Sequence, residues 1–140
     1  MRSPVRCGRA DLKRGVSTAY YALFHTLAHE CSDLLVGAGD TRNDPAWAQV
    51  YRSLEHGIAK NSCKAAATKA FPNGILSFAD TFSTMQEERH RADYDPLARY
   101  VGPDVLVLID NREQALRDLN SAPRSDRKAF AVWVLFQKKR

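Results

Sequence analysis

The sequence has few cysteines and no pattern that would pair them. Only Cys7, Cys31 and Cys63 occur among the 140 residues, and no two of them form a CxxC pair. A disulfide framework usually needs an even set of cysteines, and a zinc site needs closely spaced ligands. The small odd number argues against both, and it predicts a protein of a reducing compartment, the cytoplasm.

Long apolar runs are also lacking. No stretch of about 18 consecutive apolar residues occurs, which is the length that a membrane-spanning helix requires. The first residues, MRSPVRCGR, are basic, but no apolar segment of the kind found in signal peptides follows them. We therefore expect no membrane partner and no secretion through a signal peptide.

The common motifs of cofactor and metal chemistry are missing as well. The chain has no glycine-rich phosphate loop, no GxSxG turn and no HExxH helix. His25 and His29 lie four positions apart, a spacing that could place both on one metal, but no third ligand accompanies them. We predict no metal site and no cofactor.

What the sequence does have is a modest excess of positive charge. The 21 lysines and arginines outweigh the 16 acidic residues and give a net charge of +5. An anionic partner such as RNA is compatible with this charge, although terminal charges often only solvate a surface. Much of the excess lies near the ends of the chain, at Arg2, Arg6, Arg9, Lys13, Arg14, Arg124, Arg127, Lys128 and residues 138–140.

Apolar residues recur in steps of three and four along most of the chain, which is the period of an α-helix. Glycine, proline and asparagine clusters separate these stretches and favour turns. The spacing predicts four helices, over about 12–36, 45–61, 75–94 and 103–121. With short connections between them, we expect an all-α, antiparallel bundle of four to five helices in a single domain, 1–140, with its core in 12–122.

The last segment, 123–140, is basic at its ends and apolar in its middle. Residues 129–136 are continuously apolar, so periodicity does not distinguish a buried helix from a strand. We predict a helix there, as the fifth member of the bundle.

A first candidate site lies at the end of the third predicted helix. At 100° per residue, Arg89 falls on the apolar face of that helix, and Asp93 lies four positions further along the same face. A buried guanidinium needs a partner, so the two form either a structural ion pair or the cationic part of a cleft. His90 is a candidate general acid or base, and Arg91 and Tyr94 could bind substrate or be structural.

A second candidate site lies in the second predicted helix. Arg52 and His56 are four positions apart and point away from its apolar face. They are either a functional pair or residues that only solvate the surface. A titratable imidazole beside a guanidinium suits RNA cleavage without a metal, because a base must remove the 2′-hydroxyl proton and a cation must stabilise the phosphorane.

Two segments resemble the sequence motifs of a known superfamily. KRGVSTAYYALFH over residues 13–25 and RHRADYDP over residues 89–96 resemble the RAYYAxFH and RxxADYDP motifs of HEPN-domain proteins, in particular the small single-domain branch. The similarity extends from about residue 12 to residue 122. It implies an antiparallel helical bundle that forms a homodimer.

The resemblance also implies a function. Many HEPN proteins are metal-independent ribonucleases of toxin–antitoxin and defence systems, in which four to six residues separate an arginine from the histidine that follows it. Here Arg89 is followed directly by His90, and acidic residues and Tyr94 occupy the later positions. We expect an RNA-directed HEPN-like protein, with a nucleotidyltransferase-type antitoxin as a possible partner. The alternative is a non-catalytic HEPN module that binds a partner protein, a nucleotide or nucleic acid.

Overall fold

The computed structural model describes residues 9–137, and the regular secondary structure of this part of the chain is all helical, without strands. Cys7 and the terminal basic residues Arg2, Arg6 and 138–140 lie outside it. None of the helices in residues 9–137 is long and apolar enough to cross a membrane. The six helices are α1 (Arg9–Leu35), α2 (Asp44–Ser53), α3 (His56–Ala66), α4 (Asn73–Tyr94), α5 (Gly102–Ser121) and α6 (Arg124–Leu135).

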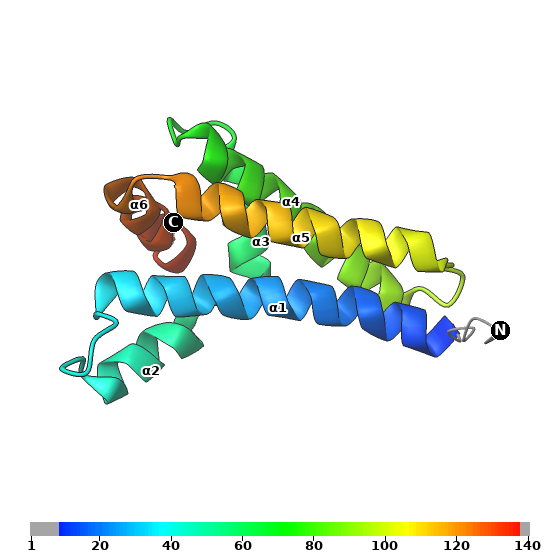
Figure 1. Cartoon of the computed structure of the whole chain (residues 1–140), viewed down its shortest axis with the longest axis horizontal. Coiled ribbons are helices and arrows are strands. Elements are labelled where there is room, and N and C mark those ends of the chain that lie inside the picture. Colours follow the sequence, from blue (N-terminus) through cyan, green and yellow to red (C-terminus); the bar gives the residue numbers. More distant parts are fainter. Residues whose placement is uncertain (1–8, 138–140) are drawn as a thin grey trace, which may run out of the picture.

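Three long helices form the body of the molecule. Helices α1 and α5 run in the same direction, and α4 runs against both of them and packs on each (Figure 1). The shorter helices complete the bundle: α2 folds back along α1, while α3 and α6 pack against each other and against the long helices. The prediction of an all-α helical bundle is therefore confirmed at the level of its architecture.

One continuous core joins these helices. Tyr20 and Leu23 of α1, Phe78 and Phe82 of α4 and Phe130 of α6 are almost completely buried. Each large apolar side chain removed from water contributes about 1.5–3 kcal/mol to folding before entropy is counted. The residues that recur at helical spacing in the sequence are thus the ones that hold α1 and α4 together.

The second predicted helix is interrupted, which the sequence pattern did not indicate. We expected one helix from 45 to about 61, but α2 ends at Ser53 and α3 begins at His56. Leu54 and Glu55 between them are extended, with ψ angles of 122° and 136°. Leu54 enters the core through this break, at 5% exposure. The expectation that Arg52 and His56 lie on one helix was therefore wrong, and the described chain has six helices rather than four or five.

Within the last segment, Arg124–Leu135 form a helix, α6, as predicted, and this helix belongs to the core. Phe130, Ala131 and Val134 of α6 are buried among the residues of the main cluster, so the core extends past residue 122. A short ion pair of 2.6 Å between the Arg127 guanidinium and the Glu30 carboxylate ties α6 to α1.

Candidate functional site

The two sequence segments that resemble HEPN motifs meet where α1 crosses α4. The guanidinium carbon of Arg89 on α4 lies 5.2 Å from the ring centre of Tyr20 and 5.5 Å from that of Tyr21, both on α1. The side chain of Arg89 is only 12% exposed. A cation held against two ring faces is stabilised by the negative potential of those faces. The crossing therefore keeps a largely buried positive charge in place.

The guanidinium has one carboxylate partner, and its Nε donor is buried without a partner among residues 9–137. Asp93, one turn further along α4, lies 3.5 Å from Arg89 and also accepts a 2.5 Å hydrogen bond from the hydroxyl of Ser17 on α1. The Nε atom of Arg89 is buried and has no hydrogen-bond partner within residues 9–137. An unmade hydrogen bond of this kind costs about 1–3 kcal/mol. The arginine thus retains hydrogen-bonding capacity beside the two tyrosines.

His56 approaches the same place from α3, of which it is the first residue. Its Nδ1 atom lies 2.6 Å from the hydroxyl oxygen of Tyr20, and its ring stacks on Phe24 with the ring centres 3.8 Å apart. The side-chain amide of Gln86 on α4 donates a 3.0 Å hydrogen bond to the backbone carbonyl of His56. Helix α4 therefore carries Arg89 and also holds the backbone that carries the imidazole.

The surroundings of this cluster favour uncharged forms of its two titratable groups. Burial lowers the pKa of His56 below its usual 6.5, and the positive charge of Arg89 and the neighbouring His25 lower it further. Burial raises the pKa of the Tyr20 hydroxyl well above its usual 10, although Arg89 opposes this shift. At neutral pH the cluster thus holds a neutral imidazole, a protonated phenol and a guanidinium. We call His56, Tyr20 and Arg89 the central cluster.

The hydrogen bond between Tyr20 and His56 allows two proton arrangements. If the Tyr20 hydroxyl donates to Nδ1, the neutral imidazole carries its own proton on Nε2 and presents a donor. If Nδ1–H donates to the Tyr20 oxygen, Nε2 is free to accept a proton. Only the second arrangement lets His56 act as a general base.

The other catalytic candidates are separate from the central cluster. Arg52 is exposed at the end of α2. His90 is exposed on α4 and packs beside Tyr94, with the ring centres 4.7 Å apart, and Tyr94 itself is 67% exposed. The structure thus brings His56 and Arg89 to one place and leaves Arg52, His90 and Tyr94 outside it.

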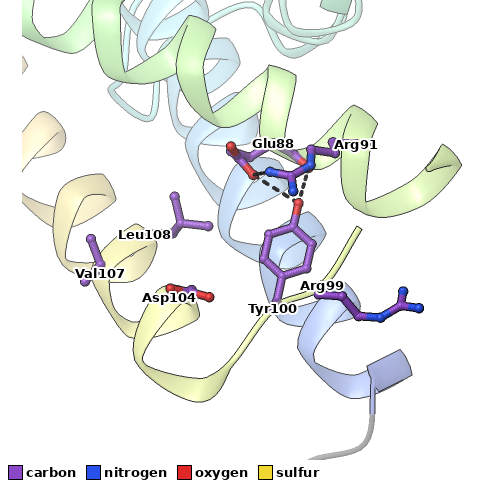
Figure 2. Close-up of a pocket in the computed structure, with 7 residues that line it drawn as sticks. All are labelled: Glu88, Arg91, Arg99, Tyr100, Asp104, Val107 and Leu108. Atoms are coloured by element: carbon purple, nitrogen blue, oxygen red, sulfur yellow. Dashed lines mark hydrogen bonds and ion pairs between the residues drawn. The ribbon is translucent and has the colours of Figure 1, made fainter. Parts of the chain in front are cut away.

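Arg91 lies in a pocket of its own, of about 330 Å³, between α4 and the start of α5. Its guanidinium lies 3.7 Å from the Glu88 carboxylate and 5.7 Å from the ring centre of Tyr100, whose hydroxyl donates to Glu88. The side chain of Arg99 extends away from these groups (Figure 2). Arg91 thus pairs with a neighbouring acid and does not belong to the central cluster.

Comparison with known proteins adds no identity. No family model matches the chain, and neither a curated protein nor a solved structure matches it. Among the described residues, no group of three or more histidine, cysteine or acidic side chains is arranged to hold a metal ion. What the central cluster can do therefore has to be inferred from its own geometry.

Two members of the site are not recognisable from the sequence. Tyr20 is buried in the core, and the sequence does not show that Tyr20 and Tyr21 position Arg89 or that Tyr20 also positions His56. Ser17, Tyr20, Tyr21 and Phe24 are related by steps of three and four on α1, and this spacing is the available signal. The spacing indicates that these four residues share one face of α1, but it does not indicate which residues of other helices pack against that face.

Proposed function

We propose that the chain is an HEPN-like protein of the toxin–antitoxin or defence type that acts in the cytoplasm as a metal-independent endoribonuclease. The observation that carries the proposal is the central cluster, in which a neutral imidazole and a largely buried guanidinium share Tyr20. The segments 13–25 and 89–96, from which the resemblance is drawn, supply two of its three residues. His56 takes the place of the histidine that the family carries after its arginine.

In the proposed reaction, Nε2 of His56 accepts the proton of a ribose 2′-hydroxyl, and the resulting oxygen attacks the adjacent phosphorus. The bond from phosphorus to the 5′-oxygen breaks, and that oxygen leaves with a proton drawn from water. The products are a 2′,3′-cyclic phosphate and a 5′-hydroxyl, so no oxidant or metal takes part. Base catalysis of this type contributes about 10²–10⁴-fold to a rate.

The other members of the cluster have supporting roles in this reaction. Arg89 stabilises the negative charge that develops on the phosphorane oxygens. Tyr20 accepts the Nδ1 hydrogen and thereby keeps Nε2 free as the base. Asp93 orients the arginine through their ion pair and is a positioning residue.

The test is cleavage of a single-stranded RNA by purified protein in the presence of EDTA. We expect cleavage by the wild type and loss of cleavage in His56→Ala and Arg89→Met, whereas His90→Ala keeps the activity because His90 lies outside the cluster. Tyr20→Phe should reduce the rate without abolishing it. Cleavage that survives in His56→Ala and disappears in His90→Ala would contradict this assignment.

One observation favours the alternative of a non-catalytic HEPN module. Arg89 is only 12% exposed and is already paired with Asp93, which suits a structural cation as well as a catalytic one. Such a module would bind a partner protein, a nucleotide or nucleic acid without changing it. Folded wild-type protein that binds RNA and leaves it intact after prolonged incubation would support this alternative.

We also propose that the partner is a second copy of the chain. Tyr20 and Phe24 of α1 are buried inside the bundle and cannot contact a second copy. Exposed apolar residues gather instead at the start of α5, where Val101, Leu106 and Val107 are 59%, 63% and 55% exposed. The neighbouring Glu88, Arg91, Arg99 and Asp104 balance in charge, so two copies of a chain with net charge +5 can meet there with little repulsion. A nucleotidyltransferase-type antitoxin remains an expectation from the resemblance.

A further inference from the structure

A row of aromatic rings leads along α1 and α2 to the central cluster. The ring centres of Trp47 and Tyr51 lie 5.3 Å apart, those of Tyr51 and His25 lie 6.0 Å apart, and those of His25 and Tyr21 lie 6.5 Å apart. Their planes differ by 30° or less at each step. We call these four residues the aromatic row. It ends at Tyr21, which contacts both Arg89 and His56.

The row is held in place by polar contacts. The Tyr51 hydroxyl lies 2.7 Å from Nδ1 of His25, and the indole Nε1–H of Trp47 donates a 2.9 Å hydrogen bond to Asp33 on α1. These contacts join rings from two helices. The row is therefore already ordered before any ligand arrives, which reduces the entropy lost on binding.

The row is accessible from solvent. Tyr21 is 38% exposed, His25 is exposed, and Trp47 and Tyr51 are partly exposed. At the far end the guanidinium of Arg42 lies 4.2 Å from the ring centre of Trp47. A ligand that follows the row would thus meet one cation at Arg42 and another at Arg89.

Few of these charges are free. Arg42 pairs with Asp44 at 2.9 Å, and His29 beside Trp47 pairs with Asp33 at 3.0 Å. A surface of this kind attracts a polyanion weakly, so a ligand would have to be recognised chiefly through its rings. An unpaired nucleic acid strand is such a ligand, because each of its successive bases offers a π face whatever its identity.

From this geometry we propose that the aromatic row is a base-stacking subsite for single-stranded RNA, which guides the strand to the central cluster. The inference rests on the proposed ribonuclease function, and it specifies the substrate as an unpaired strand. Bases within a duplex are stacked on each other and cannot reach such a row. Because Tyr21 contacts both Arg89 and His56, a strand that stacks along the row as far as Tyr21 would bring its next phosphate toward these two residues.

The binding test uses wild-type protein and a fluorescently labelled oligouridine whose 2′-hydroxyls are methylated, so that it cannot be cut. Its Kd is measured by fluorescence anisotropy. We expect Trp47→Ala and Tyr21→Ala each to weaken binding by roughly 5- to 150-fold, the effect of losing one stacked base. Tyr51→Phe keeps the ring but loses the hydrogen bond to His25, so it should weaken binding less than Trp47→Ala does. Phe136→Ala, which removes an aromatic side chain 64% exposed and outside the row, is the matched control.

Three further measurements distinguish binding through the aromatic row from binding through surface charge or from loss of the fold. The affinity should fall only slightly with rising salt, because few unpaired charges take part. An RNA duplex should not compete for the labelled strand. Circular dichroism and thermal melting of each variant show whether it is folded, and an unfolded Trp47→Ala is replaced by Trp47→Leu, which preserves bulk without the ring.

The outcomes also distinguish this proposal from the ribonuclease proposal. Binding that depends on the row, with no cleavage of unmodified RNA, would support the row and overturn the ribonuclease activity. Cleavage by the wild type together with unchanged Kd in folded Tyr21 and Trp47 variants would overturn the row alone. A wild type that does not bind the oligouridine, or whose binding is abolished equally by a duplex, overturns the row as well.

Discussion

At the scale of single residues, Tyr20 links the functional groups of this protein. It is completely buried, its ring supports the Arg89 guanidinium, and its hydroxyl contacts His56. The oxygen of a buried phenol needs a hydrogen-bond partner, and Nδ1 of His56 lies 2.6 Å from it. The requirement of the core and the requirement of the site are therefore met by one side chain.

The environment of His56 predicts a specific pH dependence of stability. Because its pKa is lowered in the folded chain, the unfolded chain binds the proton more tightly. The stability that the folded chain gains from holding His56 neutral is complete above pH 6.5 and is lost as the pH falls toward the folded-state pKa of His56. His56→Phe keeps a ring against Phe24 but cannot titrate, so its stability should decline less between about pH 7.5 and 5.5. Urea denaturation at each pH measures this, and equal declines in both proteins would contradict the prediction.

The two described thiols should be unreactive in the folded protein. Burial raises the pKa of Cys31 to about 12 and raises that of Cys63 further, so neither forms the thiolate that attacks a thiol reagent. In a Cys7→Ser background we expect no labelling by Ellman's reagent without denaturant and labelling of both thiols in urea. Rapid labelling of a folded sample would show that α1 and α3 separate readily.

At the scale of helices, the sequence predicts the features that local signals determine, which are the helix ends and the buried faces. Turn residues delimit α1, α4 and α5 to within a few positions, and apolar spacing predicts which faces are buried. The break at Leu54 and Glu55 has no glycine or proline to mark it. It arises because Leu54 enters the core and α3 packs against α4, and both are tertiary effects.

The crossing of α4 and α5 depends on a glycine. A Cβ atom at Gly74 would collide with the backbone carbonyl of Asp118 on α5 and come within 3.0 Å of the Ser121 hydroxyl. We expect Gly74→Ala to lower the free energy of unfolding by about 1–3 kcal/mol, because the backbone has to move. Gly57→Ala, whose Cβ would meet nothing within 4 Å, is the matched control and should raise stability by about 0.5–1 kcal/mol. Chemical denaturation compares the two, and equal effects would show that the crossing tolerates a methyl group.

The distinction between local sequence signals and tertiary effects also applies to the site. The pairing of Arg89 with Asp93 follows from helical spacing and could be predicted. The approach of His56 to Tyr20 could not, because these residues are 36 positions apart and no local pattern connects them. Arg91 could have been set aside, since two positions along a helix turn a side chain about 200° away from Arg89.

At the scale of the whole molecule, the exposed apolar residues at the start of α5 predict self-association. Val107→Glu should lower the sedimentation coefficient from that of a dimer to that of a monomer, because dimerisation would bury an unpaired carboxylate from each copy. Ile58→Glu, which replaces an apolar residue that is 39% exposed on α3, is the control and should leave a dimer. A wild type that sediments as a monomer at micromolar concentration would contradict the dimer proposal.

Helix α2 has no buried residue, whereas α4 contributes eight to the interior. Local opening costs little where few apolar groups leave their neighbours, so the molecule is expected to open from this side first. In hydrogen–deuterium exchange, amides of α2 should take up deuterium well before those of α4. Such opening would carry Trp47 and Tyr51 away while Arg89, Tyr20 and His56 remain together, so the protein could release a long product while its reactive groups stay assembled.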